Sequence, residues 1–516
     1  MASNVKACFR CRQKKIKCDN VRPTCQNCLK ANTPGDCIYG EDAEFPEVRL
    51  LEEKIGRLQE RIAFLENNGD SQPIMLHNPY PAPGRNEPKQ VSDIGHHALP
   101  PSTVQELMRS FSSGAAEVGL FMHMPRLLGR SAQPLAGLSE HALALMHATR
   151  LIGAYLSADA SLNGLQPVFL ALTLKDLSAA LVNLDPPAIL DVLQTEVFLA
   201  CYFFSTNRTV EGVYHMDAAS AIVLANRLHK IRSTRFPVLS DSRDDIEEGE
   251  SINAFWTTFI LDRCWSPVLG RTPIFADAEV RGTGIDTPWP LSIEAYENHP
   301  LPAEWRGFKT VQRFLFDSPF SNIEQGPLAL HAKAAALYSQ ARTAAQVSTY
   351  AFPQGWAELD RRIEQFINSL PLINSVRPTD HNMKSKLLIA YMLAYGAVIE
   401  LQKPFDRHRG VGTNKAAAAA FDAANILNQI DIRGGMLVDP MVGVVLVSVA
   451  NVLVRTLRAR RQSAAGPGSG SGSQAGDVDG IMLALVHIRW TLGAWGERSA
   501  YIKDQQNHVA TLLQGL

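Results

Sequence analysis

Six cysteines fall within the first 37 residues of this 516-residue chain. They follow the spacing C-x2-C-x6-C-x6-C-x2-C-x8-C and are Cys8, Cys11, Cys18, Cys25, Cys28 and Cys37. Two tetrahedral zinc ions need eight ligand bonds, so six thiolates suffice only if both ions share two of them. One ion held by four cysteines would leave two thiols over. The spacing therefore predicts a structural cluster of two zinc ions, with no open position for catalysis.

The same segment is strongly basic, whereas the rest of the chain is mildly acidic. Residues 1–40 carry eight lysines and arginines against two aspartates, and the remaining residues have a formal charge of −7. Counting two zinc ions and six thiolates, the segment keeps a charge of about +4. A basic head on an acidic body favours a polyanionic partner, which we expect to be double-stranded DNA.

The segment from Cys8 to Cys37 resembles the fungal zinc binuclear cluster family of transcription factors in all six cysteines and in every spacing. The resemblance implies that Cys8 and Cys25 bridge the two metals. It also implies that the first short helix enters the major groove over a CGG triplet. Base contacts would come from Lys14 and Lys15, and phosphate contacts from Arg12 and Lys17. A guanine edge offers two acceptors to such positive donors. The alternative is a metal-storage or protein-binding zinc module in which the lysines are incidental.

Residues 45–68 are predicted to form one helix with a coiled-coil seam. Apolar residues recur with 3-4-3-4-3 spacing, with β-branched residues at each a position and leucine at each d position, as in parallel two-stranded coiled coils. The seam residues are Val48, Leu51, Ile55, Leu58, Ile62 and Leu65. The helix spans fewer than three heptads, so a homodimer would need other contacts as well. The alternative is an amphipathic helix packed on the body of the chain.

The remaining chain is divided into a Pro-rich linker at 69–101 and a large helical domain at 102–516, because apolar residues recur at helical spacing from about residue 102. A Gly/Ser/Ala-rich stretch at 463–480 is expected to be a disordered loop. The longest apolar run, Met441–Val454, is too short to cross a bilayer and predicts a core helix, so no membrane partner is expected. The fold class is thus mainly α, with a small two-zinc module, a short coiled coil, a flexible linker and a large all-α regulatory domain.

Two segments of this body resemble the fungal-specific transcription factor domain. Val192–Ile231 matches a helical pair that ends in an Ala-x-x-Leu-His pattern, here Ala225, Leu228 and His229. The second segment matches a Trp…Asp-Arg…Gly-Arg-Pro signature through Trp256, Asp262, Arg263, Gly270 and Arg271, but Thr272 is inserted before Pro273. We interpret Asp262, Arg263 and His229 as structural residues.

Between these segments, the acidic stretch 240–250 is expected to be an exposed loop that ends at a helix capped by Ser251. The apolar residues Ile252, Phe255, Trp256, Phe259 and Ile260 would lie on one face of that helix.

These patterns predict a nuclear, zinc-dependent transcription factor that regulates RNA polymerase II and acts with the transcription machinery or co-regulators. A second reading is a repressor, or a heterodimer partner without its own activation function, because no strongly acidic tail studded with aromatic residues is visible. A third reading is an enzyme with a zinc-cluster appendage. No H-E-x-x-H, P-loop, G-x-S-x-G or G-x-G-x-x-G motif occurs, so we expect no catalytic residues.

Overall fold

The computed structural model describes residues 7–8, 10–11, 14–34, 37 and 39 of the N-terminal region. It also describes residues 99–515, with gaps at 184–187, 236–243, 276–283, 299–301, 318–325, 347–352, 378–379, 410–413, 432–437 and 465–472. The chain divides into two units, Met1–Pro79 and Tyr80–Leu516, each described by itself below. The predicted coiled coil at 45–68, and the linker at 69–101 up to residue 98, lie outside the described residues.

The large unit is built from helices, as predicted, and its described residues contain no strand, only one isolated parallel bridge between Ser233 and Gly307. Short 3-10 segments occur at Leu181–Asn183 (η2), Leu228–Lys230 (η4) and Ile373–Ser375 (η6), and Arg313–Asp317 (η5) is a π-helix. The α-helices are α5 (Pro101–Gly114), α6 (Met124–Ser131), α7 (Glu140–Leu156), α8 (Ala160–Asn163), α9 (Gln166–Ala180), α10 (Ile189–Ser205), α11 (Thr209–Ala225), α12 (Asp245–Val268), α13 (Ile293–Asn298), α14 (Thr310–Gln312), α15 (Pro327–Gln346), α16 (Pro353–Ser369), α17 (His381–Arg409), α18 (Asn414–Leu427), α19 (Met441–Ala464), α20 (Ser473–Gly496) and α21 (Ala500–Gln514).

Helix α12 lies in the core. The five apolar positions predicted for its buried face are all at most 5% exposed, but the opposite face is buried too. The start of this helix was predicted wrongly. Asp244, rather than Ser251, is the N-cap, and its carboxylate accepts a hydrogen bond from Glu247 N at 2.9 Å. Residues 245–250 are therefore helical, and Ser251 lies inside the helix with its hydroxyl donating to the Glu247 carbonyl.

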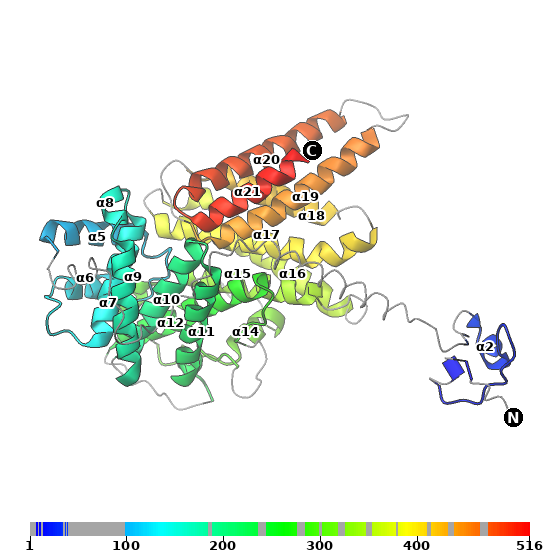
Figure 1. Cartoon of the computed structure of the whole chain (residues 1–516), viewed down its shortest axis with the longest axis horizontal. Coiled ribbons are helices and arrows are strands. Elements are labelled where there is room, and N and C mark those ends of the chain that lie inside the picture. Colours follow the sequence, from blue (N-terminus) through cyan, green and yellow to red (C-terminus); the bar gives the residue numbers. More distant parts are fainter. Residues whose placement is uncertain are drawn as a thin grey trace, which may run out of the picture. The chain divides into compact units, whose positions relative to one another are not determined.

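Helix α19 contains the apolar run that was predicted as a core helix. Among the described residues, one segment, Met441–Gln462, is long and apolar enough to cross a membrane by length and composition. However, 61% of its most apolar window is buried inside the protein, where α19 packs against α17, α18, α20 and α21. Figure 1 shows α19, α20 and α21 side by side in the last part of the chain. This packing supports the prediction of a core helix.

The ends of the neighbouring helices differ from the predictions. The predicted loop at 463–480 is shorter than expected, because α19 extends to Ala464 and α20 begins at Ser473. Val478, in the first part of α20, packs against the core. This contact favours a helix at residues that composition alone assigned to a loop. Residues 465–472 lie outside the described residues. The alanine-rich helix α18 ends at Leu427.

The Trp…Asp-Arg…Gly-Arg-Pro signature runs from α12 into the turn that follows it, and its polar residues hold this turn. The buried Asp262 carboxylate accepts hydrogen bonds from the backbone N–H groups of Ile274 and Phe275, each at 3.0 Å. Arg263 donates to the Phe275 carbonyl at 2.6 Å. Gly270 has a φ of +71° and terminates the helix, while the Arg271 N–H donates to the Ser266 carbonyl at 2.8 Å. This turn is complete before Thr272, so the extra residue leaves it intact.

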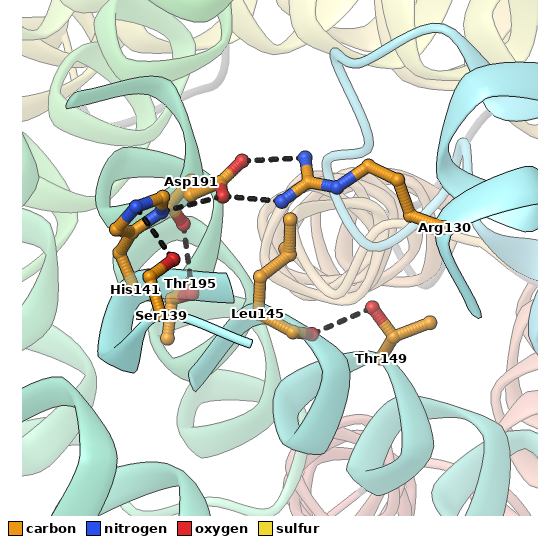
Figure 2. Close-up of polar contacts among 7 residues, drawn as sticks. All are labelled: Arg130, Ser139, His141, Leu145, Thr149, Asp191 and Thr195. Carbon is orange, nitrogen blue, oxygen red and sulfur yellow. Dashed lines mark hydrogen bonds and ion pairs between the residues drawn. The ribbon is translucent and has the colours of Figure 1, made fainter. Parts of the chain in front are cut away.

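A buried carboxylate joins three helices of the N-terminal part of this unit. Asp191 of α10 is 3% exposed, and both of its carboxylate oxygens accept hydrogen bonds from the Arg130 guanidinium of α6. One of these oxygens also lies 2.8 Å from Nδ1 of His141, on α7 (Figure 2). Burial alone would raise the pKa of Asp191, but Arg130 and His141 outweigh it and lower the pKa.

The neighbouring serine gives this network the atom order of a hydrolase triad. Ser139 Oγ lies 2.7 Å from Nε2 of His141, so hydroxyl, imidazole and carboxylate follow one another (Figure 2). Here, however, the Arg130 guanidinium binds both oxygens of the carboxylate, so Asp191 is already held in an ion pair between two helices. We therefore assign the network a structural role in joining α6, α7 and α10.

We predict that Asp191→Asn lowers the free energy of unfolding by about 2–4 kcal/mol at neutral pH, because it leaves the Arg130 guanidinium without its counter-ion. Urea denaturation followed by far-UV circular dichroism measures the change. Because folding lowers the pKa of Asp191, its stabilisation exists above the unfolded pKa and is lost as the pH falls through the folded pKa. The gap between wild type and variant should therefore close in acid.

The control for this prediction is Asp504→Asn, which removes an exposed carboxylate on α21 and should change stability by less than about 0.5 kcal/mol. Equal stability of wild type and Asp191→Asn at neutral pH would contradict the role given to the network.

Candidate metal centre and nucleic-acid interface

The N-terminal unit is organised around sulfur atoms. The thiols of Cys8, Cys11, Cys25 and Cys28 are buried, and their sulfur atoms all lie within 4.8 Å of one another. Cys8 Sγ is 3.8 Å from the sulfurs of both Cys25 and Cys28, and Cys11 Sγ is 3.6 Å from Cys25 Sγ. With a Zn–S bond of 2.3 Å, tetrahedral coordination would place sulfurs about 3.8 Å apart. The sulfurs thus have the spacing that zinc requires.

The pKa shifts of these thiols also fit a zinc site. Burial raises the pKa of Cys8, and it raises the pKa of Cys11 to about 12. Burial also opposes ionisation of Cys25, but hydrogen bonds from the Cys28 N–H and from neighbouring thiols lower its pKa to about 6. Crowded thiols of this kind ionise together only where a cation replaces their protons. The donor set therefore fits a soft divalent metal such as zinc.

The two remaining cysteines flank this group. Cys18, Asp19 and Cys25 form a second cluster of possible ligand atoms, and the Cys37 sulfur accepts a hydrogen bond from Cys25 N at 3.1 Å. Cys25 thus belongs to both clusters of possible ligand atoms. The structure brings all six predicted cysteines into one small region, five of them buried and Cys18 partly exposed.

The backbone around the sulfurs repeats itself with an offset of 17 residues. In the first half, Ile16 N–H donates to the Cys11 carbonyl at 3.0 Å, and Lys15 has a φ of +53°. In the second half, Thr33 N–H donates to the Cys28 carbonyl at 3.0 Å, and Asn32 has the same φ. Each C-x2-C pair therefore opens a short helical turn that ends in a left-handed residue, and in the second half that turn includes α2 (Gln26–Lys30).

The two halves differ in charge although their backbones agree. The first half carries Lys14, Lys15 and Lys17, all exposed. The corresponding positions of the second half hold Ala31, Asn32 and Pro34. The predicted phosphate contact Arg12 lies outside the described residues. The first half thus presents three exposed lysines at positions where the second half has no cation.

Three polar residues at the cluster were not singled out from the sequence. Asp19 accepts two hydrogen bonds from Gln26 N at the start of α2, both at 3.2 Å. Arg10 donates to the Cys28 sulfur at 3.9 Å, and the Tyr39 hydroxyl lies 3.5 Å from Cys18 Sγ. All three lie within two residues of a cysteine in the sequence, but only the folded chain shows which group each of them contacts.

Two segments of the chain match known protein families. Residues 6–43 match the fungal Zn(2)-Cys(6) binuclear cluster domain, and residues 131–365 match the fungal specific transcription factor domain. Together the two matches span more than half of the chain. Both segments whose resemblance was noted in the body lie within the second match.

Curated relatives share short regions with this chain. A transcriptional regulatory protein of Schizosaccharomyces pombe, itself uncharacterized, is 40% identical over 68 residues, which is 12% of this chain and 11% of that protein. The heme-responsive zinc finger transcription factor HAP1 of Saccharomyces cerevisiae is 41% identical over 63 residues, which is 12% of this chain and 4% of that protein. The chain therefore spans only a small part of the length of either relative.

The sulfur cluster, the helical body and the two family matches agree with one another and with the resemblance inferred from the cysteine spacing. This chain thus combines the fungal Zn(2)-Cys(6) binuclear cluster domain with the fungal specific transcription factor domain, the two domains of the family that its cysteine spacing indicated.

Proposed function

We propose that this protein holds two zinc ions with its six N-terminal cysteines and reads CGG half-sites as a homodimer in the nucleus, where it regulates RNA polymerase II transcription. The observation that carries the proposal is the charge difference between two otherwise repeated halves. The cluster fixes both turns alike, but the first half presents three exposed lysines, Lys14, Lys15 and Lys17, whereas the second half presents Lys30 alone. That half would therefore face the DNA.

In this proposal, Cys8 and Cys25 are shared by both metals. The distances support this choice, because the Cys25 sulfur lies near those of Cys8 and Cys11 and Cys25 is also a member of the cluster with Cys18. Zinc, when bound, supplies the cross-links that hold the two turns together. The cysteines supply four ligands per ion and leave no open position, so the metal has a structural role.

Reading of the DNA would depend on the turn at Lys14 and Lys15. Lys14 N–H donates to the Arg10 carbonyl at 3.0 Å, so the first lysine belongs to a helical turn, and the second ends that turn. Both ammonium groups are free to approach the O6 and N7 acceptors of guanine. Arg12 and Lys17 would bind phosphate, which orients the unit and makes binding salt-dependent.

A protein that represses transcription, or that works as a heterodimer partner, would use the same DNA-binding unit. A reporter assay with residues 69–516 fused to a foreign DNA-binding domain separates these possibilities from activation. The helical body would then contact co-regulators or the transcription machinery. The absence of a recognisable catalytic motif in the sequence favours these roles over an enzyme with a zinc-cluster appendage.

We predict that native mass spectrometry of the full chain finds two zinc ions and no disulfide among the six cysteines. Cys25→Ala should lose both ions, because a shared ligand supports both sites. Cys201→Ala, which removes a thiol of α10, should keep two. Fewer than two ions in the wild type, or oxidised cystines, would contradict the assignment of all six ligands.

For DNA recognition, we predict that Lys15→Ala removes the preference for CGG sites over scrambled DNA and keeps residual, salt-sensitive binding. The loss should be about 1–3 kcal/mol of discrimination. The matched control is Lys30→Ala, which removes an exposed lysine from the second half and should retain the preference. Fluorescence anisotropy with both DNAs at two salt concentrations measures the effect. If Lys15→Ala still distinguished CGG sites from scrambled DNA as well as wild type does, the assignment of base reading to the turn at Lys14 and Lys15 would be wrong.

For the predicted coiled coil, Leu58→Asp should convert the dimer into a monomer, because it places a charge at a d position of the seam formed by Val48, Leu51, Ile55, Leu58, Ile62 and Leu65. Glu60→Gln changes the outer f position and should leave the dimer intact. Analytical ultracentrifugation of the full chain distinguishes these outcomes. A Leu58→Asp variant that stays dimeric would assign dimerisation to another part of the chain.

A further inference from the structure

Tyr39 lies against the sulfur cluster from a position two residues beyond the last cysteine. Its hydroxyl oxygen is 3.5 Å from Cys18 Sγ, and the hydroxyl donates to the Val21 carbonyl at 3.1 Å. The Arg22 guanidinium lies over the Tyr39 ring, 5.1 Å from its centroid. Tyr39 thus contacts one cysteine and two residues of the segment that connects the halves.

A hydroxyl beside the sulfur matters more for Cys18 than for the other cysteines. It is the only partly exposed member of the six, whereas Cys8, Cys11, Cys25 and Cys28 are fully enclosed. An exposed thiolate ligand is the one that protons and competing chelators reach first. A hydroxyl beside its sulfur supplies a hydrogen-bond donor and covers part of its surface.

The segment around Cys18 is held by hydrogen bonds at alternate residues, Lys17, Asp19 and Val21. Asn27 Nδ2 donates to the Lys17 carbonyl at 2.7 Å, and Asp19 accepts hydrogen bonds from Gln26 N. Both of these partners lie on α2, in the second half. The Val21 carbonyl has its hydrogen bond from Tyr39 instead, so this tyrosine completes the attachment of the connecting segment.

One hydroxyl proton cannot serve both acceptors fully. A cysteine bound to zinc is deprotonated, so its sulfur only accepts hydrogen bonds, and a charged acceptor binds a donor more strongly than a neutral carbonyl does. We infer that Tyr39 is a positioning residue of the metal centre, whose hydroxyl hydrogen-bonds the Cys18 thiolate and slows loss of the zinc ion that Cys18 holds. The inference depends on the proposed ligand set.

The relevant comparison is Tyr39→Phe, which removes the hydroxyl and keeps the ring. Partners of metal ligands typically change metal affinity by about 10–100-fold when they are removed. We therefore expect the full-length variant to release one zinc ion about tenfold faster than wild type into an excess of a chromogenic chelator, with the second ion released at the wild-type rate.

The control is Arg22→Gln, which removes the cation over the ring and leaves the hydroxyl in place. Its release rates should stay within about twofold of wild type, since neither Cys18 nor the hydroxyl changes. If it also released one ion about tenfold faster, the ring and its cation, rather than the hydroxyl, would hold the site, and the inference would be overturned.

A second readout separates a hydrogen bond to sulfur from general loosening. In the cobalt-loaded chain, loss of the hydrogen bond should move the thiolate-to-cobalt charge-transfer band to lower energy in Tyr39→Phe, because the sulfur lone pair is no longer stabilised. Arg22→Gln should keep the wild-type band.

The outcomes distinguish this inference from the proposed function. A wild-type chain that binds fewer than two zinc ions would refute the ligand set itself. Two ions in both proteins, with equal release rates and superposable cobalt spectra, would refute only the role of Tyr39.

Discussion

Replacement of thiol protons by metal ions is the interaction on which the N-terminal unit depends. Four buried sulfurs lie within 4.8 Å of one another, and burial raises the pKa of Cys8 and Cys11. Such a group is unfavourable as free thiolates, because like charges would meet in a poorly solvated space. In the proposed two-zinc cluster, metal–sulfur bonds would replace this repulsion. The described part of the unit has little else to bury, since its core cluster consists of cysteines and Tyr39.

This dependence explains how a short segment can present lysines in a fixed geometry. A backbone held by metal needs no apolar core beneath the turn at Lys14 and Lys15, so both side chains remain exposed. The repeated hydrogen bonds to Cys11 and Cys28 show that the cysteine spacing sets the backbone in both halves. The residues between the cysteines are then left to determine charge, and in this chain they make only one half basic.

The helical body is stabilised in a different way, by a large apolar core with buried polar groups at particular places. Asp191 joins three helices through Arg130 and His141, and Asp262 binds backbone N–H groups beyond the end of α12. Each carboxylate is paired or hydrogen-bonded, as burial requires. These contacts fix how helices meet, which apolar packing alone specifies less strictly. They also give the Asp-Arg signature a structural role at the end of α12.

Many features of the structure were predicted from local sequence patterns. Cysteine spacing and helical periodicity act over a few residues, so the sequence by itself determined the metal-binding segment, the mainly helical body and the core helix at Met441–Val454. Helix ends were less certain, because Asp244 and Ser251 are both good caps and only packing of residues 245–250 favours the first. Long-range pairs were decided by the tertiary structure: Asp191 with Arg130, 61 residues away, and Tyr39 with Cys18, 21 residues away. A polar residue has many possible partners along a chain, and only the folded backbone brings one of them within hydrogen-bond distance.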